Sequence, residues 1–410
     1  MAANPSIQLG TDGNWAIKED NLLAYKKDGT RFFNKEFDFT RNTTATFVDK
    51  NGLIQQSATN TPRIDFKDDT TGHLPLEPQS TNLITYSEDF SEGIWSKNNV
   101  TVTNGFTSPS GDLSAYKLQP TQTSSVHLLN IPATSSSVKT YSVFAKQNGY
   151  KKFRFNTGSS SNGYTSFDLN TGSVVATGGT FYSSSNIEDY GNGWYKCSMT
   201  LSSNAPNNYT LAIEDDNGAV NFLGDGVSSI YIWGAQVEAL PYATSYISTS
   251  GSTVTRNAEV CNDSGSVQDF NSEEGVLYAE ISGVDDGQNR RISISDGTNN
   301  NRVVIYFNTS NNLLVLVRVA NSTSFSYTFG TDIKQFLKVG LKWKLNDFAL
   351  WVNGVKVAGD TSGPTFANNI LDGISFADGN GTSLPFYGKT KNIKVFKRAL
   401  SDAELQKLTT

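Results

Sequence analysis

Most of the chain consists of short runs in which apolar and polar residues alternate, each closed by Gly, Asn, Asp or Ser. A period of two places successive side chains on opposite faces of a β-strand, so these runs predict strands. Up to residue 247 the clearest runs are 139–146, 152–156, 194–201, 209–213 and 229–237. Beyond residue 255 they are 275–281, 291–295, 302–307, 313–319, 325–329, 336–342, 348–352 and 391–396.

Most of these strands follow one another at intervals of roughly eight to twelve residues, a spacing typical of β-sandwiches and jelly rolls. The polar stretch 248–255 interrupts the series, which then restarts. We therefore place a boundary near Thr255 and predict two consecutive β-sandwich (jelly-roll) domains, residues 79–254 and 255–410.

The first 78 residues differ from both domains, because they hold few aliphatic side chains. Short aromatic strands are separated by Asp-Gly or Asn-Gly turns at 11–14, 27–30 and 50–52, the dipeptides that tight hairpins favour. A segment this small buries too little surface to fold alone. We expect a β-rich N-terminal attachment or oligomerisation segment that packs on the next domain or on copies of itself.

One stretch near the C-terminus has a helical pattern. Ser401 is a suitable N-cap, Glu404 follows three residues later, and Leu405 and Leu408 share a face. The sequence thus predicts an all-β chain that ends in one short helix.

The composition supports this fold class, because 11% of the residues are aromatic, 18% are charged and 35 are Gly. The net charge is −6 and the basic residues form no run, which argues against a nucleic-acid partner. The first twenty residues lack the pattern of a signal peptide, and no apolar run is long enough to predict membrane insertion. Cys197 and Cys261 fall in different predicted domains, so we expect free, buried thiols.

Residues for catalysis are sparse. A triad hydrolase needs a histidine, and the sequence has His73 in a turn and His127 beside two leucines. The few His and Cys residues are too scattered for a structural zinc site. Carboxylates that a glycosidase could use occur at 188–189, 214–216 and 285–286, where solvated loop carboxylates are the simpler interpretation. We therefore predict a protein that is not an enzyme and needs no cofactor.

Calcium is the one metal for which the sequence offers candidate ligands. Asp215, Asp216, Asp285 and Asp286 supply the hard oxygen atoms that calcium prefers, although none belongs to an EF-hand loop. These four aspartates are the candidate ligands of a structural calcium site.

Glycan binding usually needs an aromatic ring that stacks on a sugar, flanked by polar side chains. Trp194, Trp233, Trp343 and Trp351 lie within strand patterns, where core positions are expected. Better candidates lie in loop-like contexts rich in Gly, Ser and Asn. The candidate glycan-binding residues are Trp95, Tyr150, Tyr164 and Tyr182.

Three stretches resemble known families. Residues 62–66 and 74–90, with Trp95, resemble a segment of bacteriophage tail and head-fibre proteins. Residues 231–249, with 256–259, resemble the closing strand and exit linker of carbohydrate-binding-module-like jelly rolls in phage structural proteins. Residues 348–356 and 393–405 resemble the concanavalin A-like, laminin G-type lectin fold. Together the resemblances cover roughly residues 40–410.

These resemblances imply a phage virion structural protein, a tail or head fibre or a decoration protein, on the particle surface. They imply a homo-oligomer, expected to be a trimer, joined to other virion proteins by its N-terminal segment, with modules that bind host cell-surface glycans. Fold alone does not set function, so two alternatives remain open. One is a purely architectural capsid or tail protein, and the other is a virion-borne glycan depolymerase.

Overall fold

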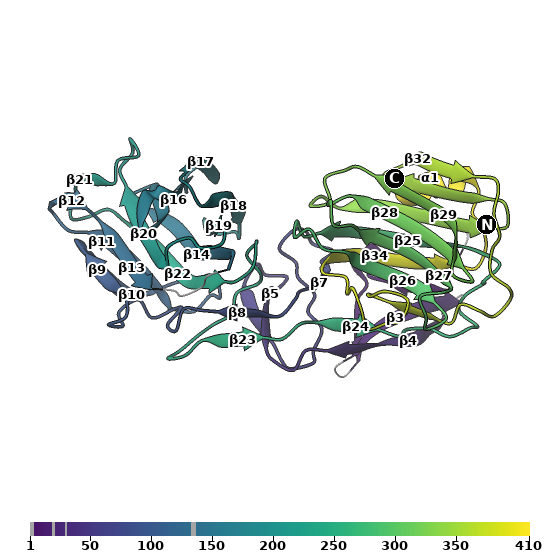
Figure 1. Cartoon of the computed structure of the whole chain (residues 1–410). Coiled ribbons are helices and arrows are strands. Elements are labelled where there is room, and N and C mark those ends of the chain that lie inside the picture. The colour runs from purple at the N-terminus through teal and green to yellow at the C-terminus, as the bar shows by residue number, and fades with distance from the viewer. Residues whose placement is uncertain (1–3, 19–20, 29–30, 133–136) are drawn as a thin grey trace. The chain divides into compact units, whose positions relative to one another are not determined.

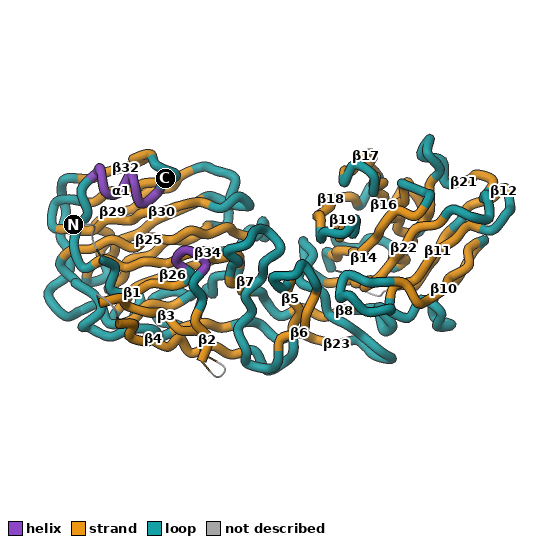
Figure 2. The backbone as a smooth tube through the Cα atoms, turned by 180° about the vertical axis from the view of Figure 1, so that it is seen from behind, coloured by secondary structure: helices purple, strands orange, loops and turns teal. Residues whose placement is uncertain are grey.

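The computed structural model describes residues 4–18, 21–28, 31–132 and 137–410. Strands make up almost all of its regular structure (Figure 2). The described residues hold one α-helix, α1 (Asp402–Thr409), and one short 3-10 helix, η1 (Thr11–Gly13). Ser401 caps α1 and forms a capping box with Glu404, as predicted. The prediction of an all-β chain with a short C-terminal helix is confirmed.

The chain forms two compact units (Figure 1). Unit 1 comprises Met1–Thr44, Ser57–Pro78 and Asn257–Thr410, and unit 2 comprises Ala45–Gln56 and Gln79–Arg256. The chain therefore passes between the units four times, and neither unit is one continuous stretch of sequence.

Unit 1 is a sandwich of two antiparallel sheets that share one core, in which Leu277, Ile305 and Trp343 are fully buried. The larger sheet runs β24 (Val260–Asn262), β4 (Arg31–Thr40), β3 (Asn21–Asp28), β1 (Ile7–Leu9), β34 (Gly388–Phe396), β25 (Glu274–Gly283), β30 (Leu337–Lys344), β31 (Phe348–Val352) and β32 (Val355–Asp360), with β2 (Ala16–Lys18) on β3 and β7 (Leu74–Leu76) on β34. The smaller sheet runs β29 (Ser322–Phe329), β28 (Leu313–Val319), β27 (Arg302–Phe307), β26 (Arg290–Ser295) and β33 (Gly373–Ser375).

Residues 1–78 do not form a body of their own, contrary to the expected N-terminal segment. Strand β1 pairs with β34, with Ile7 opposite Val395, and β24 pairs with β4. Phe37 and Leu74 are fully buried in the core of unit 1. The segment thus completes the C-terminal sandwich, except that residues 45–56 belong to unit 2.

A buried ion cluster joins these distant parts of unit 1. Arg41 and Arg63 both donate to the Glu259 carboxylate, at 2.8 Å and 2.5 Å. The carboxylate of Glu259 also accepts the backbone N–H of Glu77 at 3.0 Å. Both arginine side chains and that of Glu259 are fully buried, so each charge depends on its partners for the solvation it has lost.

Unit 2 is also a sandwich, with a core that includes Tyr141, Phe153 and Ile232. One sheet runs β10 (Val100–Phe106), β11 (Ala115–Pro120), β22 (Ser229–Glu238), β14 (Lys139–Asn148), β19 (Tyr195–Leu201) and β18 (Tyr182–Asp189). The other runs β17 (Ser173–Gly178), β16 (Ser159–Asp168), β15 (Lys152–Thr157), β20 (Asn208–Glu214), β13 (Leu128–Pro132) and β9 (Ser96–Asn98). Three two-stranded pairs complete it: β12 (Ser124–Val126) with β21 (Asn221–Leu223), β8 (Ser80–Asn82) with β23 (Val254–Arg256), and β5 (Ala45–Val48) with β6 (Ile54–Ser57).

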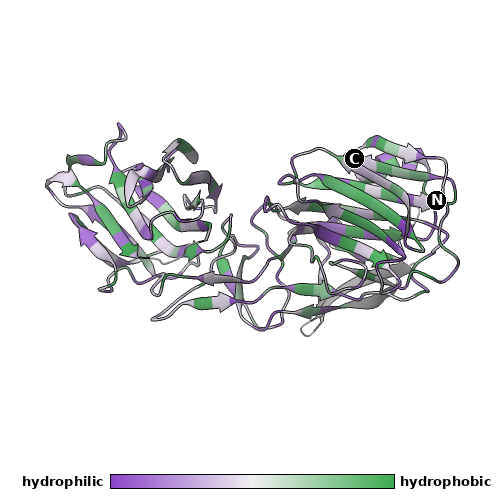
Figure 3. Cartoon of the chain, viewed as in Figure 1, coloured by the Kyte–Doolittle hydropathy of each residue, from purple (hydrophilic) through white to green (hydrophobic). Residues whose placement is uncertain are grey.

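The strands of both units carry hydrophobic stretches with hydrophilic positions among them (Figure 3). Trp194, Trp233, Trp343 and Trp351 are buried, which confirms their prediction as core residues. Both cysteines are free and buried, also as predicted.

The predicted turns have three outcomes. Gly52, at a φ of 76°, closes the turn between β5 and β6 as expected. Residues 11–13 form a short 3-10 helix, η1 (Thr11–Gly13), instead of a hairpin turn. For the turn predicted at 27–30, residues 29–30 lie outside the described residues.

Candidate ligand-binding site

The second sheet of unit 2, β17-β16-β15-β20-β13-β9, has one buried face and one polar face. On β15 and β20, Phe153, Phe155, Tyr209 and Leu211 point into the core. Because successive side chains of a strand point to opposite faces, the residues that alternate with them lie on the outer face. At one end of the two strands these outer residues are uncharged, and at the other end they are charged. The uncharged ones are Asn156, Asn208, Thr210 and Ala212, and the charged ones are Lys152, Arg154 and Glu214.

A row of polar residues crosses this outer face from strand to strand. Ser96 is opposite Asn130, and Asn130 is opposite Thr210. Thr210 is in turn opposite Asn156, and Asn156 is opposite Tyr164. Neighbouring strands lie about 4.8 Å apart, so the five positions extend over about 19 Å.

The polar row lies along a groove with a volume of about 530 Å³. Pockets of roughly 300–1,000 Å³ are the usual size for small-molecule ligands. None of the described residues that line the groove is charged. The lining residues are Ser96, Val126, Leu128, Asn130, Pro132, Asn156, Gly158, Ser159, Ser160, Asn208, Thr210, Ala212 and Val220.

The hydrogen bonds in the groove orient its amides. The Thr210 hydroxyl donates to Oδ1 of Asn130 at 2.6 Å, and the Ser160 hydroxyl lies 3.4 Å from Oδ1 of Asn156. Amides and hydroxyls both donate and accept, and the partly exposed side chains of Val126 and Leu128 add an apolar surface beside them. This combination suits an uncharged ligand that carries many hydroxyl groups and apolar C–H faces.

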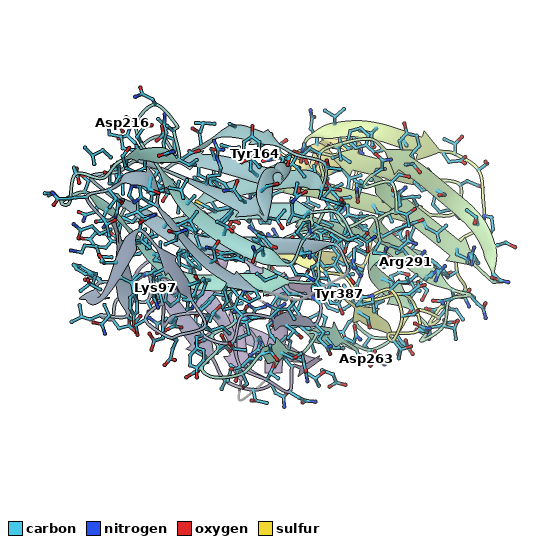
Figure 4. The ribbon with its side chains drawn as sticks, turned by 60° about the vertical axis from the view of Figure 1, so that its left-hand side comes forward. Lys97, Tyr164, Asp216, Asp263, Arg291 and Tyr387 are labelled. Atoms are coloured by element: carbon cyan, nitrogen blue, oxygen red, sulfur yellow. The ribbon has the colours of Figure 1, made fainter. Side chains whose placement is uncertain are left out.

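Beyond the groove, the row ends at Tyr164, which Figure 4 labels and whose ring packs against the Arg154 guanidinium. The Arg154 guanidinium carbon lies 4.6 Å from the centre of the Tyr164 ring. Arg154 also donates to Glu214 at 2.6 Å and to the Ser166 hydroxyl at 3.0 Å. Ser166 donates to the same Glu214 oxygen at 2.9 Å. This network fixes both the arginine and the aromatic ring.

Glu214 itself is almost fully buried. Burial raises the pKa of its carboxyl above the usual value, although the charge of Arg154 opposes the shift. Its second oxygen, Oε2, is buried and has no hydrogen-bond partner among the described residues. Glu214 therefore serves to position Arg154, with one polar atom left unsatisfied.

The structure brings only one of the four predicted glycan-binding residues to this site, namely Tyr164. Trp95 is a core residue, 1% exposed, and its Nε1 donates to the Tyr86 carbonyl at 2.9 Å. It offers no ring face at the surface, so we withdraw it as a candidate. The prediction failed because its Gly- and Ser-rich surroundings suggested an exposed loop.

Tyr150 and Tyr182 lie outside the groove lining, and both are half-buried. The Tyr150 ring packs against Phe222 at 5.3 Å, and its hydroxyl accepts from the Asp225 backbone N–H at 3.3 Å. Tyr182 lies in strand β18 and its hydroxyl is 3.1 Å from that of Ser185. Tyr164 and Tyr182 thus belong to strands and not to the loops that the sequence suggested.

The four candidate calcium ligands have protein partners. Asp215 closes a turn by accepting the backbone N–H of Asn217 and Ala219, and Asp216 lies 3.6 Å from the Lys151 amine. Asp285 accepts from Asn311, and Asp286 accepts from Arg290 at 2.5 Å. Across the described ranges, no three His, Cys, Asp or Glu side chains are grouped so that they could hold a metal ion.

Both histidines are enclosed by their surroundings. The two ring nitrogens of His127 lie 2.7 Å and 3.1 Å from the carbonyls of Asn99 and Phe222. His73 is 2% exposed, and burial together with the charge of Lys389 lowers its pKa to about 3. In the part of the chain that is described, no helix is long and apolar enough to cross a membrane.

Sequence reasoning missed the residues that form the groove. Asn156 and Thr210 lie within predicted strands, and each follows a side chain of the core. Alternation is thus the signal that could have placed both side chains on the outer face. What one sequence cannot reveal is that β15 and β20 are neighbours, which is what puts the two side chains in one row.

No protein-family model and no curated protein matches this chain. Several solved structures are similar in part. The CBM40 module of a Ruminococcus gnavus IT-sialidase, bound to α2,3-sialyllactose, is 17% identical and covers 36% of this chain and 94% of its own, with a TM-score of 0.32. Domains LG4-5 of the mouse laminin α1 chain are 10% identical in sequence, and the match covers 69% of this chain and 92% of the laminin chain, with a TM-score of 0.25.

A sialidase of Trypanosoma rangeli, in complex with sialic acid, is 8% identical and covers 96% of this chain and 61% of its own, with a TM-score of 0.27. Similarity at these TM-scores says nothing of what this chain binds.

Proposed function

We propose that this chain is a glycan-binding protein, and that unit 2 binds an uncharged oligosaccharide along the groove on its outer sheet face. The observation that carries the proposal is the row of Ser96, Asn130, Thr210, Asn156 and Tyr164 across five adjacent strands. It supplies neutral donors and acceptors in a line, with an aromatic ring at one end, as sugar recognition requires.

A glycan array probed with the full chain tests this proposal. We expect binding to neutral oligosaccharides of several units, because the polar row extends over about 19 Å and the described lining of the groove is uncharged. A blank array would contradict the proposal and favour the purely architectural alternative. The bound glycan should stay intact on prolonged incubation, and release of reducing ends would instead favour the depolymerase.

We further propose that the chain is displayed on the surface of a phage particle, as a homotrimer in a tail fibre, head fibre or decoration protein. The sequence resemblances at 62–66, 74–90 and 231–249 support this placement. Gold-labelled antibodies against the chain should decorate intact particles in electron micrographs. Light scattering should give a mass three times that of the 44.6 kDa chain. Unlabelled particles or a monomeric mass would each contradict the corresponding part.

A further inference from the structure

The outer face of the smaller sheet of unit 1 carries three arginines on adjacent strands. Arg291 lies on β26, Arg302 on β27 and Arg318 on β28 (Figure 4 labels Arg291). Arg302 and Arg318 are directly opposite each other, and Arg291 is opposite Tyr306. The residue next to each arginine in sequence is part of the core, namely Ile292, Val303 and Val317. Successive side chains of a strand point to opposite faces, so the arginines point away from the core.

One carboxylate is shared by two of these arginines. Oδ2 of Asp378 accepts from Arg291 at 2.6 Å, and Oδ1 accepts from Arg302. Arg318 forms no ion pair with any described residue. Three positive charges and one negative charge therefore share this surface, which leaves an excess of two positive charges.

The excess charge is poorly solvated. The side chains of Arg302 and Asp378 are 6% and 4% exposed. The Nε atoms of Arg291, Arg302 and Arg318 are buried and have no hydrogen-bond partner among the described residues. Burial lowers the pKa of Arg302, and the charges of Arg291 and Arg318 lower it further against the opposing effect of Asp378. Buried donors and unbalanced charge both favour an added anion.

An apolar strip lies beside the arginines on the same face. Tyr306 and Leu314, which are opposite each other on β27 and β28, are both partly exposed, whereas the next pair along these strands, Val304 and Leu316, is buried. The Arg291 guanidinium carbon lies 4.7 Å from the centre of the Tyr306 ring. A ligand that reaches the arginines therefore also meets an apolar surface, which suits the C–H face of a sugar ring.

We propose that this face of unit 1 is a binding site for the carboxylate of an acidic saccharide, separate from the neutral groove of unit 2 and independent of its function. Asp378 shows how the arginines bind a carboxylate, because each of its two oxygens accepts from one guanidinium group. A ligand carboxylate between Arg302 and Arg318 repeats that arrangement and neutralises half of the excess charge.

Calorimetric titration of the full chain with oligogalacturonate tests the proposal. Binding should weaken as salt is added, because charge attraction is screened. The carboxyl-reduced form of the same oligosaccharide should bind at least tenfold more weakly. Arg318→Ala should weaken oligogalacturonate binding at least tenfold without unfolding, since Arg318 is partly exposed and has no ion pair with a described residue.

Arg398→Ala is the matched control, because it removes one positive charge from an exposed site of the same unit and should leave binding unchanged. Arg318→Lys keeps the charge but loses the forked donor, and should bind with intermediate affinity. The proposal is overturned if oligogalacturonate does not bind, if Arg318→Ala binds it normally, or if the carboxyl-reduced sugar binds equally well. Binding of a sulfated oligosaccharide in place of the carboxylated one would also overturn it.

Discussion

The indole of Trp95 packs against the rings of Phe90 and Tyr209, with centroids 4.9 Å and 6.1 Å away. Truncation of a buried aromatic removes apolar burial and leaves a cavity. We predict that Trp95→Ala lowers the free energy of unfolding of unit 2 by about 3–5 kcal/mol, measured by urea denaturation. A loss below about 1 kcal/mol would contradict the core assignment.

His73 predicts a pH dependence for unit 1. Its pKa is lowered from 6.5 to about 3 in the folded protein, so below pH 6.5 the unfolded chain takes up a proton that the folded chain refuses. Stability must therefore fall as the pH drops from 6.5 towards 3. We compare the decrease in the free energy of unfolding from pH 7 to pH 5, measured by urea denaturation. This decrease should be about 2 kcal/mol smaller in His73→Gln than in the natural chain.

Carboxylates titrate in both proteins over this range, so the difference between the two losses isolates the histidine. Equal losses in the natural chain and in His73→Gln would show that His73 accepts a proton when folded.

The contrast between Trp95 and Asn156 shows what could be predicted residue by residue. Alternation assigns Asn156 to the outer face of a strand without any knowledge of the fold. The burial of Trp95 depends on the rings of Phe90 and Tyr209, and Tyr209 is more than one hundred positions away in the sequence. Local composition carries no signal for such a contact.

At the scale of elements, the C-terminal helix offers a contained test. Ser401 accepts from the Glu404 backbone N–H, and Glu404 in turn accepts from Ser401. Ser401→Ala removes one half of this capping box and should destabilise unit 1 by about 1 kcal/mol in thermal or urea unfolding. Ser401→Asp can still cap the helix and should retain most of the stability, and a loss equal to that of Ser401→Ala would contradict this role.

Strand prediction succeeded where apolar residues are frequent and failed where they are rare. β27, β28 and β31 have the predicted bounds. β16 and β18 were not predicted, because runs such as 159–162 and 183–186 consist of Ser and Asn. These strands owe their conformation to pairing with β15 and β19, and such pairing leaves little trace in their own residues.

At the scale of the whole molecule, the N-terminal strands decide which fragments can fold. A fragment of residues 255–410 lacks β1, β2, β3, β4 and β7 and seven core side chains: Ile7, Leu9, Phe37, Phe39, Ile64, Leu74 and Leu76. Their burial is worth about 10 kcal/mol, comparable to the net stability of a domain. We predict that this fragment shows no cooperative thermal transition by circular dichroism.

The matched control is a chain of residues 1–44, 57–78 and 257–410 joined by short Gly-Ser linkers. Its junctions are close in space, because Glu259 bonds to the backbone of Glu77 and Asn60 bonds to that of Arg41. This chain should unfold cooperatively. Cooperative unfolding of the 255–410 fragment would contradict the assignment of the N-terminal strands to unit 1. No periodicity in a single sequence could have revealed that β1 pairs with β34, at the other end of the chain.

Titration of a neutral glycan identified on the array tests the central claim most directly. The variant Asn156→Ala with Asn208→Ala removes two amides from the groove, and neither residue is in the core. Asn186→Ala removes an exposed amide from the other sheet of unit 2 and serves as the control. We predict that the groove variant binds at least tenfold more weakly, equivalent to about 1.4 kcal/mol, while the control binds like the natural chain. Unchanged affinity in the groove variant would contradict the assignment of this sheet face as the glycan site.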